Sequence, residues 1–349
     1  MAYRQHLEAF VQLGRLFNKF SKSDTIENDP WTNQLAETLV KAEIQNSWFT
    51  YDNLSYCIKQ WCEVLRENQL SEWLSEYKNS LPHSKKVAII MAGNIPLVGF
   101  HDFLSVLLAG HQVLAKLSSN DNILLPFIKD YLVHVDVTIE NKIEFTEEKL
   151  DDFDAVIATG SNNTSRYFDH YFGKYPNIIR KNRNSVAVLS GEETSSQLEA
   201  LAEDIFRYFG LGCRSVSKIF VPKDYNFDPF FNAIFEWKHV LEHHKYINNY
   251  DYNKAVYLMS EVKIFDNGFL ILKEDKGYSS PIATLFYEYY ESRESLALKL
   301  QEENEHIQCT VSEDFTADTV PFGQTQAPSL SDYADGVDTM EFLKNIPFQ

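Results

Sequence analysis

Cysteine is scarce in this chain of 349 residues, where Cys57, Cys62, Cys213 and Cys309 are few and scattered. This excludes the disulfide framework of small secreted proteins and indicates reduced thiols, of which one can be reactive. Long apolar runs are also missing, since crossing a bilayer requires about 20 consecutive apolar residues. The first residues carry no basic and apolar secretion signal. We therefore expect a cytoplasmic protein without a membrane span.

Basic charge is in short supply as well. The chain has 32 Lys and Arg residues against 50 Asp and Glu residues, which gives a formal net charge of -18. Binding to nucleic acid or to an anionic membrane is excluded, because neutralising phosphates requires a basic surface. A nucleotide or coenzyme A would instead be held locally, by helix N-termini, backbone amides and single cationic side chains.

The chain contains no internal repeat, and its length predicts two domains with a substantial core. From residue 3 to residue 80, apolar residues recur every three or four positions, which predicts helices. A strand at 86–91, a helix at 97–109 and a strand at 113–117 then form a right-handed parallel βαβ unit. The same alternation continues and indicates a doubly wound α/β architecture. Further strands are predicted at residues 142–145, 153–159, 186–189, 215–221, 262–265, 269–272 and 282–287.

Two turns that follow predicted strands carry groups suited to binding. In residues 93–96 the Asn94 side chain is a neutral amide donor beside a helix N-terminus, which suits a developing oxyanion. In residues 160–164 the backbone amides that open a helix fit a phosphate group as well as an ordinary capped helix start. Ligands of open parallel sheets bind at the carboxyl ends of strands, so these two turns and the Cys213 segment described next are the candidate sites that we expect there.

The third candidate is Cys213, which follows Gly210 and Gly212 and precedes a predicted strand. Taken alone, a free cysteine is more often a small buried apolar side chain than a nucleophile. The glycines allow the backbone to approach a ligand, and Arg214 would favour the thiolate, although adjacent strand residues point to opposite faces.

Two other chemistries fit poorly. The hydrolase elbow requires a glycine where Ser215 stands and a helix where a strand is predicted. The spacing from His239 to His243 matches the H-x-x-E-H pattern of some zinc peptidases, but the surrounding charges favour a solvated helix end. We therefore predict neither a hydrolase triad nor a metal site.

In their order along the chain, these segments resemble the aldehyde dehydrogenase superfamily, and within it the acyl-CoA reductases of the LuxC type, over residues 85 to 345. The resemblance implies that Cys213 is the nucleophile and that Asn94 helps to form the oxyanion hole. It also implies cofactor contacts at Lys116, Ser118, Gly160, Ser161, Pro281 and Phe322. Oxidising members of the superfamily have a Glu-Leu-Gly-Gly stretch whose glutamate activates the hydrolytic water. Residues 183–186 of this chain, Arg-Asn-Ser-Val, resemble a replacement of that stretch, which favours thioester exchange over hydrolysis.

The implied fold is α/β and aldehyde-dehydrogenase-like, with two doubly wound domains and a helical N-terminal region. The expected ranges are 1–82 for the helical region, 83–190 for the nicotinamide-cofactor domain, 191–320 for the catalytic domain and 321–349 for a C-terminal return segment. The implied reaction reduces an acyl thioester, of fatty acyl-CoA or an acyl carrier, to the aldehyde through an acyl-enzyme on Cys213. NADPH is the expected cofactor, with NADH as its alternative, and a homo-oligomer is implied by the resemblance alone.

Alternatives stay open at this point. A dehydrogenase acting on aldehydes or on acyl phosphates would use the same fold, although the missing glutamate counts against an aldehyde oxidiser. A non-redox acyl-binding or acyl-transfer protein would keep Cys213 and lose hydride transfer. In the resembled superfamily, a Glu-x-Phe-Gly-Pro element binds the nicotinamide ribose, whereas residues 278–281 of this chain read Tyr-Ser-Ser-Pro. This departure favours the non-redox interpretation, since fold alone does not secure function.

Overall fold

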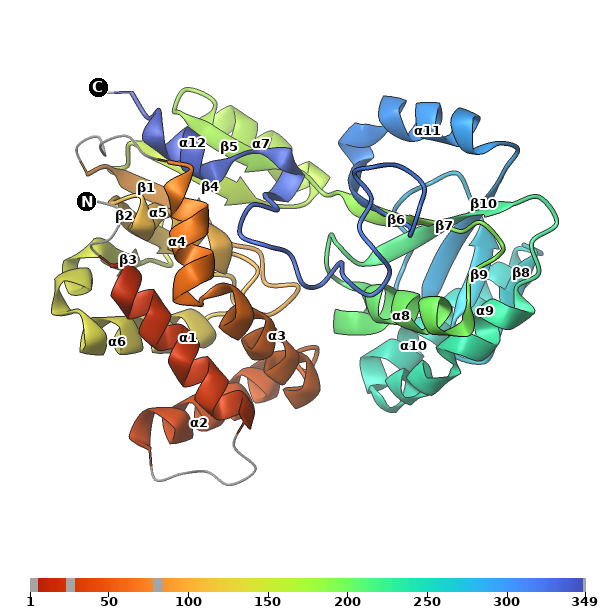
Figure 1. Cartoon of the computed structure of the whole chain (residues 1–349), viewed down its shortest axis with the longest axis horizontal. Helices are drawn as coiled ribbons and strands as arrows, with labels where there is room; N and C mark the ends of the chain where they lie inside the picture. Colours follow the sequence, from red (N-terminus) through yellow and green to blue (C-terminus); the bar gives the residue numbers. More distant parts are fainter. Residues whose placement is uncertain (1–5, 23–28, 78–83, 348–349) are drawn as a thin grey trace. The chain divides into compact units, whose positions relative to one another are not determined.

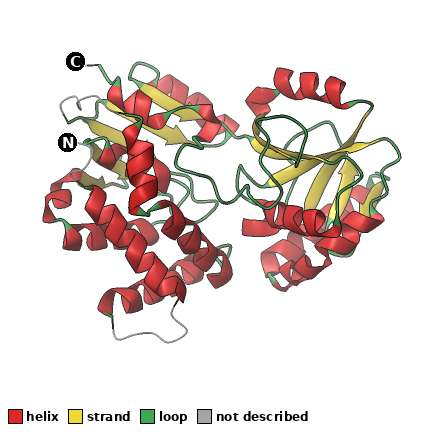
Figure 2. Cartoon of the chain, in the orientation of Figure 1, coloured by secondary structure: helices red, strands yellow, loops and turns green. Residues whose placement is uncertain are grey.

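The computed structural model describes residues 6–22, 29–77 and 84–347, in two compact units (Figures 1 and 2). The first unit comprises residues 1–181 and 329–349, and the second comprises residues 182–328. The expected boundary between residues 82 and 83 lies outside the described residues. The roles expected for the ranges 83–190 and 191–320, cofactor binding and catalysis, stay predictions.

Four helices open the first unit, as the apolar spacing of this region predicts. They are α1 (Leu7–Lys22), α2 (Pro30–Gln45), α3 (Tyr51–Val64) and α4 (Glu67–Ser75). On α1 the side chains of Phe10, Leu13 and Phe17 follow the helical period and are fully buried. Burying this stripe against α2, α3 and α6 holds the helical region on the rest of the first unit.

The first sheet is entirely parallel, with the order β3-β2-β1-β4-β5. Its central strands are continuous apolar runs, as strands covered on both faces require. The strand order reverses direction between β1 and β4, and ligands of doubly wound sheets bind at such a reversal. The strands are β1 (Lys86–Ile90), β2 (Gln112–Lys116), β3 (Ile143–Phe145), β4 (Ala155–Thr159) and β5 (Asn177–Arg180).

Helices follow these strands in the doubly wound manner. They are α5 (Phe100–Leu108), α6 (Leu124–Val135) and α7 (Asn162–Phe172). Right-handed crossovers from β1 to β2 and from β4 to β5 run in opposite directions along the sheet, which puts α5 and α7 on opposite faces. Phe168 and Phe172 of α7 accordingly pack against the apolar cluster that includes Val156 of β4.

The second sheet is mixed, with the order β11-β6-β7-β10-β9-β8, in which β8 alone among these strands runs antiparallel to its neighbour. Helices α8 (Ser195–Phe206), α9 (Asp228–Ala233) and α10 (His244–Met259) cover one face, and α11 (Arg293–Glu302) covers the other (Figure 1). The strands are β6 (Asn184–Val188), β7 (Val216–Pro222), β8 (Ile264–Asp266), β9 (Ile271–Glu274), β10 (Thr284–Tyr290) and β11 (Ile307–Val311).

The chain returns to the first unit after residue 328 and ends in α12 (Thr339–Lys344). Buried polar groups fix this return. Arg180 pairs with Asp102 of α5 and its Nη2 also donates to Thr339 Oγ1 at 3.2 Å. His111 Nε2 lies 3.1 Å from the carbonyl oxygen of Leu343. Among the described residues, no helix is both long and apolar enough to span a membrane.

The return segment predicts an acid-sensitive contribution to stability. Burial lowers the pKa of His111, whose side chain also accepts from the backbone N–H of Lys85 at 3.1 Å. The unfolded histidine then binds a proton that the folded one does not, so its contribution is present above about pH 6.5 and is lost as the pH falls. We expect the free energy of unfolding of His111→Gln to fall less than that of the wild type between about pH 7.5 and about pH 5.5.

Urea unfolding at several pH values measures this difference. The matched control is His170→Gln, which changes an exposed histidine on α7. If the free energy of unfolding changes equally with pH in the wild type and in His111→Gln, the prediction is contradicted.

Candidate active site

The turn after β1 presents Asn94 at the carboxyl edge of the first sheet, where its side chain is exposed. The turn packs so closely that a Cβ on Gly93 would lie 2.4 Å from Ser118 Oγ, so glycine is required there. Pro96 accepts a hydrogen bond from the Cys57 thiol through its carbonyl oxygen, at 3.5 Å. Leu97 then adopts a left-handed conformation with φ of 54°, and α5 begins three residues later than the sequence predicts.

The turn after β2 lies directly beside it. The backbone N–H of Met91 donates to the carbonyl oxygen of Lys116 at 3.1 Å, which joins the two strand ends. Lys116 Nζ donates to the carbonyl of Glu148 at 3.0 Å, and Ser118 Oγ accepts from the backbone N–H of Asn120 at 3.2 Å. The structure thus brings the segment of Lys116 and Ser118 together with the Asn94 turn.

The turn after β4 opens α7. Ser161 is the N-cap, and its Oγ accepts from the backbone N–H of Thr164 at 3.2 Å. A Cβ on Gly160 would lie 2.9 Å from the ring of Phe168, so glycine allows the helix to pack against the strand end. The helix start is therefore capped as an ordinary one, and its remaining first-turn amides and dipole suit an anion. Phosphate binding here stays a prediction.

Cys213 belongs to the second unit and lines a cavity of about 390 Å³ within it. Pro281 lines the same cavity, so the structure brings these two predicted residues together. The cavity lies at the amino ends of β6, β7 and β10, whereas the other candidate turns lie at carboxyl ends. The expectation that strand carboxyl ends mark the sites therefore does not locate Cys213.

The cavity wall contains thiol, amide, hydroxyl, guanidinium and apolar groups. Of the described residues that line it, none carries a carboxylate or an imidazole. Asn184 and Arg183, from the segment that replaces the activating glutamate of the resembled superfamily, are part of the wall. Apolar side chains form much of the remainder: Ile205, Phe206, Phe209, Leu211, Val216, Tyr246, Leu270 and Ile282.

The loop that leads to Cys213 has an unusual backbone. Tyr208, Phe209 and Gly210 are consecutive left-handed residues, with φ of 55°, 56° and 75°. Such a conformation costs roughly 1–3 kcal/mol for a bulky non-glycine residue, and strain of this kind clusters at functional sites. The loop is held by Ser185 Oγ, which donates to the carbonyl oxygen of Cys213 at 3.0 Å.

Arg214, expected to favour the thiolate, has its Nε directed to the carbonyl oxygen of Thr325 at 2.6 Å. It thereby ties the Cys213 loop to residues 321–326. In that segment Phe322 is 5% exposed and is not among the residues that line the cavity. Asp204 of α8 holds the segment, since its carboxylate accepts from the backbone N–H groups of Gly323 at 2.6 Å and of Thr325 at 3.0 Å.

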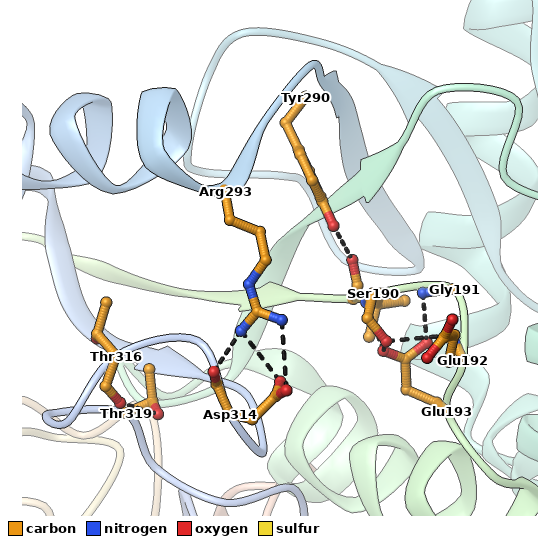
Figure 3. A network of polar contacts seen from close by, with 10 residues as sticks. Ser190, Gly191, Glu192, Glu193, Tyr290, Arg293, Asp314, Thr316 and Thr319 are labelled. Carbon is orange, nitrogen blue, oxygen red and sulfur yellow. Dashed lines mark hydrogen bonds and ion pairs between the residues drawn. The ribbon is translucent and has the colours of Figure 1, made fainter.

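The carboxyl edge of the second sheet is built differently. Figure 3 shows a polar network there, in which Arg293 pairs with Asp314 and Glu193 Oε2 accepts from the backbone N–H of Gly191 at 3.1 Å. The hydroxyl of Tyr290 donates to a backbone carbonyl of the loop after β6 at 2.8 Å. The polar groups at this edge are therefore hydrogen-bonded or ion-paired with one another.

The H-x-x-E-H segment is not an α-helix. Residues 234–242 form a 3-10 helix, and His243 follows it as the C-cap. Because a 3-10 helix has three residues per turn, residues four apart do not share a face, and His239 instead contacts the carbonyl oxygen of Glu236 at 2.8 Å. Among the described residues, no group of three potential ligands is placed to hold a metal ion.

Solved aldehyde dehydrogenases share this fold. Aldehyde dehydrogenase 21 from Physcomitrella patens, in complex with succinate, has a TM-score of 0.66 at 11% identity, over 99% of this chain and 84% of its own. An indole-3-acetaldehyde dehydrogenase in complex with NAD+ has a TM-score of 0.61 at 12% identity, over 88% and 71%. Lactaldehyde dehydrogenase from Escherichia coli has a TM-score of 0.59 at 10% identity, over 89% of this chain and 78% of its own. The aldehyde-dehydrogenase-like fold class is confirmed.

Residues 7–236 match the family described as acyl-CoA reductase (LuxC). The chain therefore belongs to the LuxC family of acyl-CoA reductases, and it is an oxidoreductase. No curated protein matches it. The predicted family and enzyme class are thus confirmed.

Asp204 yields a prediction for the segment that contains Phe322. Asp204→Ala removes the acceptor of the half-buried Gly323 N–H group and of the buried Thr325 N–H and hydroxyl groups. We expect a loss of about 2–4 kcal/mol in the free energy of unfolding, because each buried donor without a partner costs roughly 1–3 kcal/mol. Urea unfolding measures it, with Glu199→Ala on the exposed face of α8 as control. A loss no larger than that of the control would refute this role for Asp204.

Proposed function

We propose that the chain reduces a fatty acyl-CoA to the aldehyde with Cys213 as nucleophile, Asn94 as oxyanion donor and NADPH as hydride source. The acyl-CoA reductase class follows from family membership, and the residue roles are our assignment. The observation that carries it is a half-buried thiol in a cavity whose described wall lacks carboxylate and imidazole groups. Such a wall contains no side chain suited to activate water, so an acyl group on sulfur would survive hydrolysis.

The chemistry begins with attack of Cys213 Sγ on the thioester carbonyl. A new sulfur–carbon bond forms, the bond to the coenzyme A sulfur breaks, and that thiolate leaves and takes a proton from water. When bound, the nicotinamide cofactor supplies the hydride that reduces the acyl-enzyme. The resulting thiohemiacetal on Cys213 loses its hydroxyl proton and collapses to the aldehyde and the cysteine thiolate.

Asn94 and the backbone N–H of Cys213 donate to the oxygen that becomes negative in both tetrahedral steps. Removing one such donor costs about 100–1,000-fold in kcat, because fixed donors stabilise the charge without reorganisation. The exposed amide of Asn94 at a strand end supports this role.

Several features fit a nicotinamide dinucleotide. The capped N-terminus of α7, with Gly160 and Ser161, suits its pyrophosphate, and Lys116 and Ser118 suit its adenosine ribose. Pro281 lines the Cys213 cavity, which supports a contact near the nicotinamide ribose. Phe322 is buried, so we propose that it supports the cofactor site by packing and not by direct contact. The NAD+ bound to indole-3-acetaldehyde dehydrogenase is consistent with a dinucleotide ligand.

The acylation of Cys213 is directly testable. Incubation with a fatty acyl-CoA in the absence of NADPH should add one acyl group to the wild type and none to Cys213→Ala, because the thiol is the acceptor. Intact-mass spectrometry measures the adduct. Cys309→Ala, which removes the other half-buried thiol, is the matched control and should remain acylated.

An adduct of equal yield on Cys213→Ala would refute the assignment. Acylation of the wild type without oxidation of NADPH or NADH after cofactor is added would instead support the acyl-transfer alternative. Greater activity with an acyl phosphate or an aldehyde than with acyl-CoA would favour the dehydrogenase alternatives. A carrier-protein thioester and a homo-oligomer stay part of the proposal through the family resemblance, and a cytoplasmic location stays part of it through the sequence features given above.

The preference for NADPH rests on Lys116. A carboxylate near the end of the second strand binds the ribose 2′-hydroxyl of NAD, whereas a cation accommodates the 2′-phosphate of NADP. β2 ends at Lys116. Lys116→Ala should lower kcat/KM for NADPH by about tenfold, equal to about 1.4 kcal/mol, and should lower that for NADH by less, because NADH keeps the ribose contact but has no 2′-phosphate. Initial rates with both cofactors measure this, and the exposed Lys149→Ala is the control. An equal loss with both cofactors would contradict it.

A further inference from the structure

Asp121 is a buried carboxyl group that the proposed mechanism does not use. It closes the turn after β2, where its backbone N–H donates to the carbonyl oxygen of Ser118 at 3.0 Å, and its side chain is 7% exposed. One carboxylate oxygen, Oδ2, accepts from the backbone N–H of Leu97 at 2.8 Å. The other, Oδ1, is buried without a hydrogen-bond partner among the described residues.

This arrangement is energetically costly. A buried acceptor without a partner loses its hydration, and burial raises the pKa of Asp121 to about 7. Leu97, which Asp121 holds, is a left-handed residue of a type that rarely adopts this conformation. Strained backbone persists when its surroundings over-determine it, and such positions cluster at functional sites. The carboxylate therefore stabilises a backbone shape that is unfavourable on its own.

The turn held in this way is the one that contains Asn94. Leu97 follows Asn94 by three residues, and on the other side of Asn94 the backbone of Gly93 abuts Ser118 in the Asp121 turn. The two turns therefore contact each other on both sides of Asn94. A displacement of the Asp121 turn would move the Asn94 amide with it.

The N-terminal helices fix the Asp121 turn in its place. At the end of α2, Gln45 Nε2 donates to the carbonyl oxygen of Ser119 at 2.6 Å. The adjacent Asn46 Nδ2 donates to the carbonyl oxygen of Asn120 at 3.3 Å. From α3, the Cys57 thiol donates to the Asn94 turn itself. The support of the turn thus runs from the helices through Asp121 to Leu97.

We propose that Asp121 is a positioning residue, which holds the Asn94 turn in the conformation that aims the Asn94 amide at the oxyanion. The inference rests on the proposed role of Asn94. Asp121 does not touch the substrate, because its unpaired oxygen is sealed from solvent. It acts through Leu97 and the backbone of residues 93–97.

A double-mutant cycle tests the proposal. Asp121→Leu keeps similar bulk and removes the acceptor, whereas Asp121→Asn keeps an oxygen that can accept from Leu97. Both are compared with Asn94→Ala and with the Asp121→Leu/Asn94→Ala double variant in steady-state reduction of a fatty acyl-CoA. Circular dichroism establishes that each variant is folded at the assay temperature.

Asp121→Leu should lower kcat by about 10–100-fold, because a displacement of about 1 Å by a change away from the chemistry costs up to about 100-fold. KM should change little, since the lost interaction forms in the transition state. Asp121→Asn should retain most of the activity. In the Asn94→Ala background, Asp121→Leu should have little further effect on kcat, because the two changes remove the same stabilisation.

An equal loss of kcat from Asp121→Leu in both backgrounds would overturn the proposal, as would wild-type activity in Asp121→Leu. Unchanged kcat in Asn94→Ala would overturn the role of Asn94 and this inference with it, while acylation of Cys213 in that variant would show that the thiol chemistry stands. Should Asp121→Leu not fold, Asp121→Ser replaces it, because serine is small and polar and its hydroxyl is too short to reach Leu97.

Discussion

The parallel pairing of β1 with β2 on one side and β4 on the other is the constraint on which the first unit depends. Parallel strands end at the same edge, so turns that lie far apart in the sequence meet there. Asn94 follows β1, Lys116 ends β2, and Gly160 follows β4. The strand order reverses between β1 and β4, and we propose that the nucleotide binds at this edge.

In the second unit the proposed nucleophile, Cys213, lies at the amino ends of the strands. Cys213 precedes β7 and does not stand in a strand–helix turn, and its loop has a left-handed backbone and accepts a hydrogen bond from Ser185. A thiol suits this position better than a hydroxyl would. Cysteine is intrinsically nucleophilic and partly ionised near neutral pH, whereas serine needs an adjacent base that the described cavity wall lacks.

Sequence patterns predicted the architecture well, because central strands are continuous apolar runs and the glycine-containing turns between elements are distinctive. The two strands that the sequence analysis missed, β5 and β11, lie at sheet edges, where half-exposed strands carry polar residues and lose the apolar signature. The helix predicted from residue 97 begins at Phe100, because the contact of Leu97 with Asp121 is a tertiary interaction without a local signal. Asp204 could have been suspected, since it lies three residues after Leu201 on the apolar face of α8.

The sequence indicated candidate reacting groups more readily than the residues that hold them in place. A nucleophile or an amide donor must sit in a turn of particular glycine and proline content, so its neighbours mark it. A supporting residue needs only to reach a backbone group, and Gln45 and Asp121 do so from segments that read as ordinary polar surface. The helical region therefore contributes rigidity at the strand ends as well as apolar burial, and a donor aimed at a developing charge depends on that rigidity, because a loosely held amide loses its advantage over water.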